Sequence, residues 1–395
     1  MNKKWFFSGV ATGAVIASLG IGSFVMASGY NGYGKNDNVM GVGNKLNYIL
    51  SMLEKYYVDD IDAKALEEGL YKGVVAGIGD PYTSYLTTDE FSALTDDTTG
   101  SFSGIGVTIS AKEYYDGIEI INTLGGSPAE SAGILAGDVI TKVNGNKIEG
   151  METDEVIKMI KGPEGEEVDI TVYRPSDKKE MDFSIERKTI NVVTAQGEML
   201  DNSIGYIKIK QFNQNTFDQF KAVLEDLKNQ GMKGLIIDVR DNPGGVLTGV
   251  KDITDLLVGE GTMVYTIDKE GNRKDYVSDA NKLGLPLVVM INGNSASASE
   301  ILSGAIQDMG EGKLVGTQSF GKGLVQGIYK LPDNSGIKIT IQKYYTPKGV
   351  CIQGEGLTPD YVVELDGGIT NSNLVTRDKD NQLDKAIEVI NGEIK

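Results

Sequence analysis

The stretch PLVVMINGNSASASEIL, which runs from Pro286 to Leu302, decides the fold class of this chain. Its first part, up to Ile291, is a short apolar run that indicates a buried strand. From Ser297 onward the apolar side chains recur at helical spacing. The stretch therefore predicts a strand, a turn and a helix, with Ser297 at the start of the helix. In open α/β sheets functional sites gather outside the carboxyl ends of the strands, where this turn would lie.

A second unit of the same kind lies upstream of this stretch. Apolar strands are predicted at residues 205–209 and 235–239, and the segment between them has the pattern of an amphipathic helix around Phe217. The order strand, helix, strand predicts parallel pairing through a right-handed crossover. The second strand runs into the loop 240–245, which would lie beside the turn that holds Ser297.

The choice of a base for Ser297 is constrained by composition. The sequence contains no histidine, which removes the Ser-His-Asp arrangement. Another group must then activate a serine nucleophile. Lys322 lies between Gly321 and Gly323, where the backbone can turn tightly and approach another segment closely. We predict that Ser297 is the nucleophile and that Lys322 is the base, buried so that its amine is neutral at the working pH.

Two features near Ser297 would suit the negative charge that develops when a hydroxyl attacks a carbonyl. The start of a helix exposes N–H groups, and Gly244 and Gly245 can bring bare backbone N–H groups to the same point. We therefore predict an oxyanion hole made from Gly245 and Ala298. The alternative is that Ser297 only caps the helix, because Ser297 and Glu300 have the spacing of a capping box, which would contribute about 1 kcal/mol without any chemistry.

Composition also excludes several classes of ligand. The net charge of −18 argues against nucleic acid, since a phosphate-binding surface needs clustered Lys and Arg. No cluster of His or Cys suits a metal ion. The run from Gly316 to Lys322 copies the start of a phosphate-binding loop, but Gly323 stands where a Mg²⁺-coordinating Ser or Thr is required. The sequence thus predicts no cofactor, metal or nucleotide.

The first residues predict export. Two lysines precede an uncharged stretch from Trp5 to Met26, which is about the length that spans a bilayer. The residues Val25-Met26-Ala27 also have the small-residue spacing of a signal-peptidase site. The segment is therefore predicted either to anchor the chain in a membrane or to be cleaved, and both readings place the body outside the cytoplasm.

Two more regions follow. Residues 38–94 have helical spacing, with Asp62 as a plausible N-cap of a second helix, and the polar run 96–101 is predicted to be a linker.

Residues 101–187 are predicted to form short strands. They contain GIGV, from Gly104 to Val107, then SPAESAG, GDVI and a helical pattern at 153–160. This order resembles a PDZ domain of the circularly permuted bacterial kind. PDZ domains bind a peptide C-terminus by adding it as a strand, with loop N–H groups on its carboxylate. A small β-domain that only packs is the alternative.

Taken with these motifs, the chain resembles the carboxyl-terminal processing proteases, also called tail-specific proteases, of the PDZ-containing Ser-Lys type. The resemblance rests on five motifs in order: Asp80–Tyr85, Asp238–Gly245, Ser295–Glu300, Phe320–Gly323 and Tyr344–Pro347. It covers nearly all of the chain after the first segment.

The resemblance implies roles for particular residues. In this family the nucleophile is the middle serine of SASAS and the base is the lysine of FGKG, which correspond to Ser297 and Lys322 here. Gln326 stands where the family has a glutamine that orients the lysine. It implies that Gly104, Ile105, Gly106 and Val107 form the carboxylate loop. Lys161 stands where relatives carry an arginine that helps the PDZ domain switch the protease on, and a lysine keeps the charge without the bidentate fork.

The expected architecture is a multidomain α/β protein: an α/β protease core of the ClpP/crotonase type, an inserted PDZ β-domain and an N-terminal helical arm. The expected boundaries are 1–28 for the anchor or signal segment, 29–100 for the arm, 101–187 for the PDZ domain, 188–364 for the core and 365–395 for a C-terminal linker and helix. The expected function is a serine endopeptidase that engages protein substrates with free apolar C-termini. A homodimer is left open, and a silent PDZ scaffold at the membrane and an acyl-transferring enzyme are the alternative functions.

Overall fold

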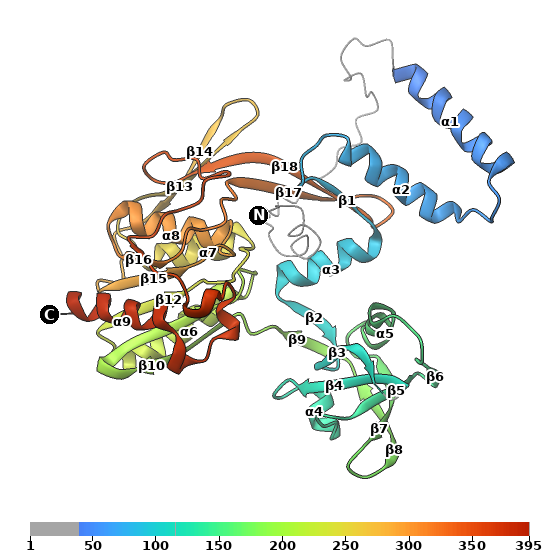
Figure 1. Cartoon of the computed structure of the whole chain (residues 1–395), viewed down its shortest axis with the longest axis horizontal. Helices are drawn as coiled ribbons and strands as arrows, with labels where there is room; N and C mark the ends of the chain where they lie inside the picture. Colours follow the sequence, from blue (N-terminus) through green and yellow to red (C-terminus); the bar gives the residue numbers. More distant parts are fainter. Residues whose placement is uncertain (1–38, 115, 395) are drawn as a thin grey trace.

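The computed structural model describes residues 39–114 and 116–394 (Figure 1). The predicted membrane segment at residues 5–26 lies outside these ranges. Within them, no helix combines the length and the apolar character needed to cross a bilayer.

A six-stranded sheet forms the centre of the C-terminal half, in the order β10-β11-β12-β15-β16-β19. The five strands from β11 to β19 are parallel, and β10 is an antiparallel edge strand. The strands are β10 (Ala195–Leu200), β11 (Ile204–Ile209), β12 (Gly234–Asp238), β15 (Leu287–Ile291), β16 (Lys313–Gly316) and β19 (Tyr361–Val362). The predicted parallel pairing of the strands before and after the first amphipathic helix is confirmed.

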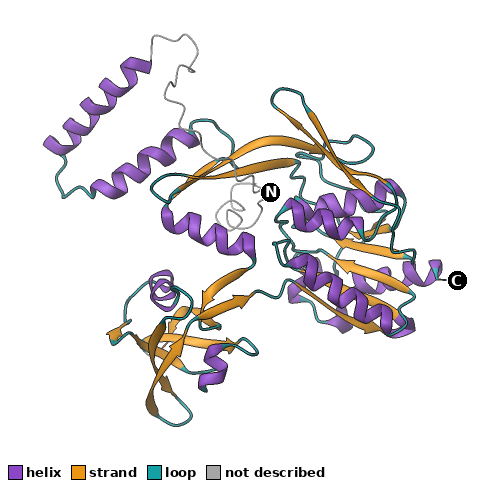
Figure 2. Cartoon of the chain, turned by 180° about the vertical axis from the view of Figure 1, so that it is seen from behind, coloured by secondary structure: helices purple, strands orange, loops and turns teal. Residues whose placement is uncertain are grey.

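Helices cover both faces of this sheet, which explains why its central strands are apolar without alternation. Ile237 and Val289 belong to the cluster that contains the helices α6 (Thr216–Asn229), α7 (Leu247–Asp255) and α8 (Ala298–Met309). Ile236 and Val288 face the opposite way, against α9 (Asn381–Glu393). The layers are visible in Figure 2. Short 3₁₀ helices occupy Asp201–Ser203, Asp366–Gly368, Ser372–Leu374 and Arg377–Lys379.

A second sheet rises from the core as a long curved ribbon, β17 and β18, that reaches toward the N-terminal helices (Figures 1 and 2). It has five strands, and β18 pairs with β1, β13 and β17. The strands are β1 (Ser84–Leu86), β13 (Gly261–Asp268), β14 (Arg273–Ser278), β17 (Leu324–Lys330) and β18 (Gly336–Tyr345).

The segment before residue 100 forms α1 (Val39–Tyr56), α2 (Ala63–Ala76) and α3 (Thr88–Thr99). Asp62 caps α2 as predicted, because its carboxylate accepts hydrogen bonds from the N–H groups of Lys64 and Ala65. Two local expectations were wrong. The short strand β1 interrupts the helical region, and the polar run 96–101 is not a linker, since it completes α3 and enters the strand β2 (Ser101–Gly104).

A small β-domain, here called the inserted domain (residues 107–186), hangs from a pair of antiparallel strands, β2 and β9 (Lys188–Asn191) (Figure 1). Its sheet has the order β3-β4-β5-β7-β8, with β6 paired to β5. Its strands are β3 (Val107–Tyr114), β4 (Gly117–Thr123), β5 (Val139–Val143), β6 (Asn146–Lys147), β7 (Glu167–Arg174) and β8 (Lys179–Glu186), and its helices are α4 (Pro128–Ala132) and α5 (Thr153–Ile160). It has an apolar core of its own, which includes Ile120, Ile140 and Val172.

Candidate active site

Ser297 lies in a strained turn between β15 and α8. Its backbone has φ 57° and ψ −111°, a conformation that non-glycine residues rarely adopt. The turn is held on both sides, since the Tyr344 hydroxyl donates to the Ser297 carbonyl (3.1 Å) and the Ser297 N–H donates to the Glu300 carboxylate (2.8 Å). The Ser297 side chain is fully buried, yet its Oγ has no hydrogen-bond partner among the described residues. The turn therefore holds the backbone of Ser297 and leaves its hydroxyl available.

Lys322 lies in the loop between β16 and β17, and its position depends on its two glycine neighbours. A Cβ on Gly321 would lie 2.8 Å from the backbone nitrogen of Gly356, and one on Gly323 would lie 2.8 Å from that of Gln353. The glycines thus allow this loop to pack against the segment 353–356. The lysine itself is fully buried.

The surroundings of the Lys322 amine disfavour its charged form. Burial, followed by the positive charge of Lys338, lowers the pKa of Lys322 to about 7, although Glu300 and Asp80 act in the opposite direction. The ring of Tyr82 covers the amine, with 4.9 Å between Nζ and the ring centroid. A substantial fraction of this lysine is therefore neutral at neutral pH, which an exposed lysine would not be.

One carboxylate joins the two segments. Glu300 Oε2 accepts hydrogen bonds from the N–H of Ser297 (2.8 Å) and from the N–H of Lys322 (2.9 Å). In addition, the N–H of Phe320 donates to the carbonyl of Ser295 (3.0 Å). The fold thus brings the SASAS turn and the FGKG loop into direct contact.

The glycine loop at residues 242–245 lies against the same turn. A Cβ on Gly244 would lie 2.8 Å from the Cβ of Ser297 and 3.0 Å from the nitrogen of Ala298. The N–H of Gly244 is used inside the loop, where it donates to Asn242 Oδ1 (2.9 Å). No hydrogen bond of the described residues uses the N–H of Gly245 or Ala298.

Gln326 is buried on β17, and its side chain is turned toward β18. Its Nε2 donates to Thr340 Oγ1 (3.2 Å), whereas its Oε1 is buried without a partner in the described chain. The hydrogen bond between Gln326 and Lys322 that the resemblance implies is therefore not formed in this structure, and the orienting role of Gln326 stays a prediction.

The motif at Asp80–Tyr85 had no predicted task of its own. The structure places Tyr82 over the Lys322 amine, as described above. Asp80 accepts hydrogen bonds from Thr83 Oγ1 (2.6 Å) and from the N–H of Tyr82 (3.0 Å), which holds this tight turn in shape. The dense DPYTSY motif was the only sequence signal for this contribution, because the contact joins positions far apart in the chain.

The predicted carboxylate loop, Gly104 to Val107, lies between β2 and β3. Gly106 has φ 78°, and a Cβ there would lie 2.4 Å from the Cβ of Ser127. The carbonyls of Ile105 and Gly106 accept from Ala129 and Leu124 (2.9 Å each), but no hydrogen bond of the described residues uses the N–H groups of Ile105 and Gly106. β3 forms an edge of its sheet. An edge strand that begins at a loop with free N–H groups is suited to accept a peptide end.

Lys161 lies at the end of α5 and contacts α3. Its amine pairs with Asp96 (2.8 Å) and lies 4.9 Å from the centroid of the Phe102 ring. Lys158, one turn earlier on the same helix, pairs with Asp89 (2.7 Å). In this structure the basic residue predicted to regulate the site is thus engaged with α3.

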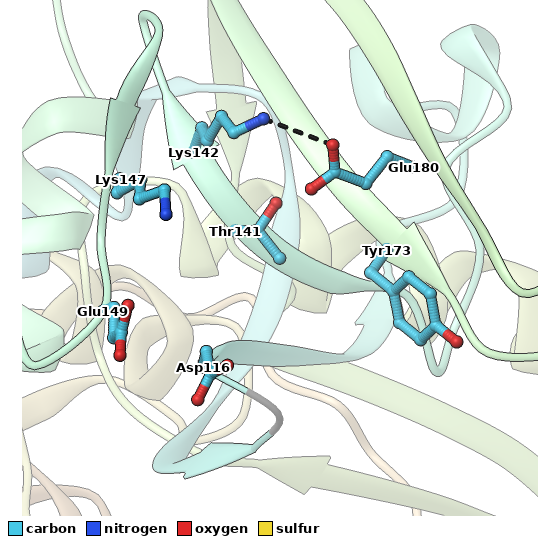
Figure 3. A pocket seen from close by; sticks show the side chains of 7 residues that line it. All are labelled: Asp116, Thr141, Lys142, Lys147, Glu149, Tyr173 and Glu180. Atoms are coloured by element: carbon cyan, nitrogen blue, oxygen red, sulfur yellow. Dashed lines mark hydrogen bonds and ion pairs between the residues drawn. The ribbon is translucent and has the colours of Figure 1, made fainter.

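A hollow of about 310 Å³ lies elsewhere, on the inserted domain, where it is lined by residues of β5, β6, β7 and β8 (Figure 3). Its lining is polar and mixed in charge, and Lys142 and Glu180 in that lining form an ion pair (3.2 Å). None of its lining residues belongs to the strained turn, the lysine loop or the glycine loop. We therefore do not assign the chemistry to it.

Comparison with known proteins places the sequence among protein families. A family model described as peptidase family S41 matches residues 203–363, and a PDZ domain model matches residues 124–174. A carboxy-terminal-processing protease of Bartonella bacilliformis is 36% identical over 325 residues, which cover 80% of this chain and 74% of that protein. A carboxyl-terminal-processing protease of Synechocystis is 34% identical, with 81% and 75% covered.

Among solved structures, one titled photosystem II D1 C-terminal processing protease superimposes with a TM-score of 0.48 at 28% identity, covering 83% of this chain and 89% of that one. The length and identity of the sequence matches decide the family. This chain, a mixed α/β protein with a PDZ domain, belongs to peptidase family S41 and is a serine peptidase of the carboxy-terminal processing type.

Proposed function

We propose that this peptidase cleaves peptide bonds through an acyl-enzyme on Ser297, with Lys322 as the general base. The neutral amine of Lys322 accepts the proton of the Ser297 hydroxyl while Oγ attacks the carbonyl carbon of the scissile bond. The ammonium then gives that proton to the leaving amine, and the first fragment departs. Water, deprotonated by the same lysine, hydrolyses the ester and releases the second fragment.

The observation that carries the proposal is the pairing of two unusual states. Ser297, in a strained turn, has a hydroxyl with no hydrogen-bond partner in the described part of the chain. The loop bonded to the same Glu300 carboxylate carries a fully buried lysine, Lys322, whose pKa is lowered to about 7. A serine that only capped its helix would use its hydroxyl for the cap.

The oxyanion hole is assigned to the N–H groups of Gly245 and Ala298. Both are free of other acceptors in the described chain, whereas the N–H of Gly244 is occupied by Asn242. Two such donors, fixed in place before the reaction, stabilise the negative charge that develops on the carbonyl oxygen. Together with the neutral lysine, they supply the proton transfer and the charge stabilisation that the reaction needs.

Substrates are proposed to be proteins with free apolar C-termini. The carboxylate would lie on the N–H groups of Ile105 and Gly106, and the tail would pair with β3 from its open edge.

We further propose that the chain is exported and is anchored or processed through residues 1–28. We also propose that residues 188–364 form a core of the ClpP/crotonase type, preceded by an N-terminal helical arm. The support for export is the uncharged stretch after two lysines.

The test is to incubate the chain from residue 39 onward with unfolded β-casein and to map fragments by mass spectrometry. Fragments are expected with the wild type and are expected to be absent with Ser297→Ala. A fragment pattern that survives Ser297→Ala would overturn the assignment of the nucleophile. No cleavage by either protein, with tight binding of the casein, would favour the silent scaffold.

A further inference from the structure

Glu300 is a buried acid whose hydrogen bonds exceed what a helix cap requires. It is the third residue of α8 and is 1% exposed. Oε2 accepts from the N–H groups of Ser297 (2.8 Å) and Lys322 (2.9 Å), and Oε1 accepts from the N–H of Gly321 (2.7 Å) and the hydroxyl of Ser319 (2.5 Å). Burying a carboxylate is costly unless such donors replace water.

Most of these donors lie outside the helix that Glu300 would cap. Only the N–H of Ser297 belongs to the start of α8, and the donors of Ser319, Gly321 and Lys322 belong to the loop that carries the base. Glu90 of α3 is a useful contrast: it accepts from the N–H of Thr87 (2.8 Å) at the same helix position, but it is exposed and its other contact is Lys72. Capping alone therefore needs neither the burial nor the additional donors of Glu300.

The network extends to a third segment. The Ser319 hydroxyl, which donates to Glu300, accepts from the N–H of Leu357 (2.7 Å). The adjoining residues 353–356 are the ones against which Gly321 and Gly323 pack. One carboxylate thus fixes the nucleophile turn, the base loop and, through Ser319, the segment behind that loop.

We propose that Glu300 is the positioning residue of this active site: its carboxyl group fixes the backbone of Lys322 relative to that of Ser297, so that amine and hydroxyl meet in one geometry. Burial raises the pKa of Glu300, and the hydrogen bonds from Ser319, Lys322, Gly321 and Ser297 oppose this rise by favouring the carboxylate. The proposal rests on the Ser-Lys mechanism proposed above. Glu300 touches neither the substrate nor the reacting atoms, so it acts through the two residues it aligns. Displacements of about 1 Å in such an alignment cost on the order of 100-fold in rate.

Glu300 also has an electrostatic effect that separates this role from simple capping. The charged groups that face the Lys322 amine are Lys338 on β18, Asp80 in the turn before β1, and Glu300 on α8. Glu300 and Asp80 favour the ammonium, and Lys338 opposes it. Removing the charge of Glu300 should therefore favour the neutral amine, and the loss of activity on the acid side should move to lower pH.

Two substitutions separate alignment from charge. Glu300→Gln keeps the size but places an NH₂ group against at least one N–H donor, so we expect kcat to fall on the order of 100-fold with KM within about 3-fold, and the acid limb of the pH profile to move to lower pH. Glu300→Asp keeps the charge but cannot reach all four donors, so kcat should fall while the acid limb stays in place. Glu90→Gln is the matched control and should leave kcat, KM and the acid limb unchanged.

The measurement uses fluorescently labelled β-casein and the chain from residue 39 onward, with thermal unfolding recorded for each variant. Wild-type activity that Ser297→Ala abolishes is the prerequisite, and its absence would overturn the proposed function rather than the role of Glu300. If both Glu300 variants are unfolded, Ser319→Ala tests the proposal instead. It removes one donor to Glu300, so kcat should fall by less than the roughly 100-fold expected for Glu300→Gln, while KM stays constant. The proposal is overturned by folded Glu300→Gln protein with kcat close to that of the wild type. A second result would also overturn it: Glu300→Gln loses activity only in proportion to the loss of folded protein, and its acid limb stays in place.

Discussion

At the scale of single residues, the site depends on the protonation of Lys322. The amine can accept a proton only when it is neutral, and burial together with Lys338 lowers its pKa to about 7. Lowering the pKa further would make the lysine a weaker base, and raising it would leave the lysine charged. A value near the working pH is the best compromise for a general base.

Substituting Lys322 tests this dependence directly. Lys322→Arg and Lys322→Met should both lose about 1000-fold or more in kcat, because neither side chain can accept a proton from Ser297 near neutral pH. The wild-type rate should fall on acidification as a single group titrates near pH 7. Rates of casein cleavage between pH 5 and 9 provide the measurement, with circular dichroism to confirm folding. Cleavage by Lys322→Arg near the wild-type rate would show that another residue is the base.

The same pKa makes a prediction about stability. The pKa of Lys322 is about 7 in the folded protein and about 10.4 in the unfolded chain, so between these values the unfolded state binds more protons. Stability therefore rises with pH in this window through Lys322. The comparison uses two proteins, Ser297→Ala as the parent and the same protein with Lys322→Met, which lacks the titrating amine. Between pH 7 and pH 9 the free energy of unfolding of the Lys322→Met protein should fall by about 2 kcal/mol relative to that of the parent. Urea unfolding at the two pH values measures the change, and a constant difference would mean that the lysine is not desolvated.

At the scale of elements, the glycine loop 242–245 brings backbone close to Ser297. Gly244 has φ 107° and Gly245 has φ 146°, and a Cβ on Gly245 would lie 1.7 Å from the carbonyl oxygen of Phe212. The two glycines have different tasks, because Gly245 packs against the backbone of Phe212 and Gly244 faces the nucleophile turn. A side chain on Gly244 would push the loop away from the Ser297 turn, and one on Gly245 would push it away from Phe212.

Gly244→Ala should therefore impair catalysis as well as stability. The new Cβ would meet the Cβ of Ser297 at 2.8 Å and the carbonyl of Ala296 at 2.8 Å, so the turn must shift. We expect a loss on the order of 100-fold in kcat and about 2 to 4 kcal/mol in stability. Gly271→Ala is the control, since Gly271 has φ 86° with nothing within 4 Å of its Cβ position. It isolates the cost of the backbone angle, about 1 kcal/mol, and should leave kcat unchanged. Equal effects of the two substitutions would contradict close packing at Gly244.

The edge strand β3 leads to a binding prediction. The open edge and the free N–H groups of Ile105 and Gly106 should select a peptide with a free, apolar C-terminus. In the Ser297→Ala protein, such a peptide should bind at least about 10-fold more tightly than its C-terminally amidated form, which lacks the carboxylate charge. Fluorescence anisotropy of the labelled pair gives the two dissociation constants. Equal constants would remove the carboxylate loop from the proposal.

Elements whose signal is local could be predicted from sequence, and elements made by distant pairing could not. The strand before Ser297 and the helix α5 at 153–160 follow from apolar runs and helical spacing, which are properties of a short window. β1 is three residues long and exists only because β18 lies beside it. Glu300 shows the same limit within the site, since its spacing from Ser297 suggested a cap, and the donors from the Lys322 loop appear only in the folded chain.

At the scale of the whole molecule, the N-terminal segment completes a site built from the C-terminal half. The antiparallel pairing of Ser84, Tyr85 and Leu86 with Lys338, Ile337 and Gly336 places the preceding turn, with Tyr82, over Lys322. We expect the Tyr82 ring, 4.9 Å from Nζ, to help keep water from the amine. The base therefore receives its environment from a part of the chain about 240 residues earlier.

Tyr82 can be tested by separating its ring from its hydroxyl. Tyr82→Ala should open the Lys322 amine to water, raise its pKa and move the acid limb to higher pH, so that the rate at pH 7 falls about 10-fold. Tyr82→Phe keeps the ring over the amine and should leave the acid limb in place. The pH dependence of casein cleavage by both variants checks this expectation. An acid limb that Tyr82→Ala leaves unmoved would show that the ring does not desolvate the lysine.

The pairing of β1 with β18 also sets a time at which the enzyme can first act. During synthesis the segment 84–86 emerges long before residues 336–338, and contacts so distant in sequence form late in folding. Until they form, the turn with Tyr82 has no strand to hold it over Lys322, and an uncovered lysine stays charged. In a growing chain Lys322 is thus expected to be charged and inactive as a base. It becomes a working base only when β1 pairs with β18. Chains that end before Gly336 would lack the partner strand, and proteolysis by such chains would refute this order of events.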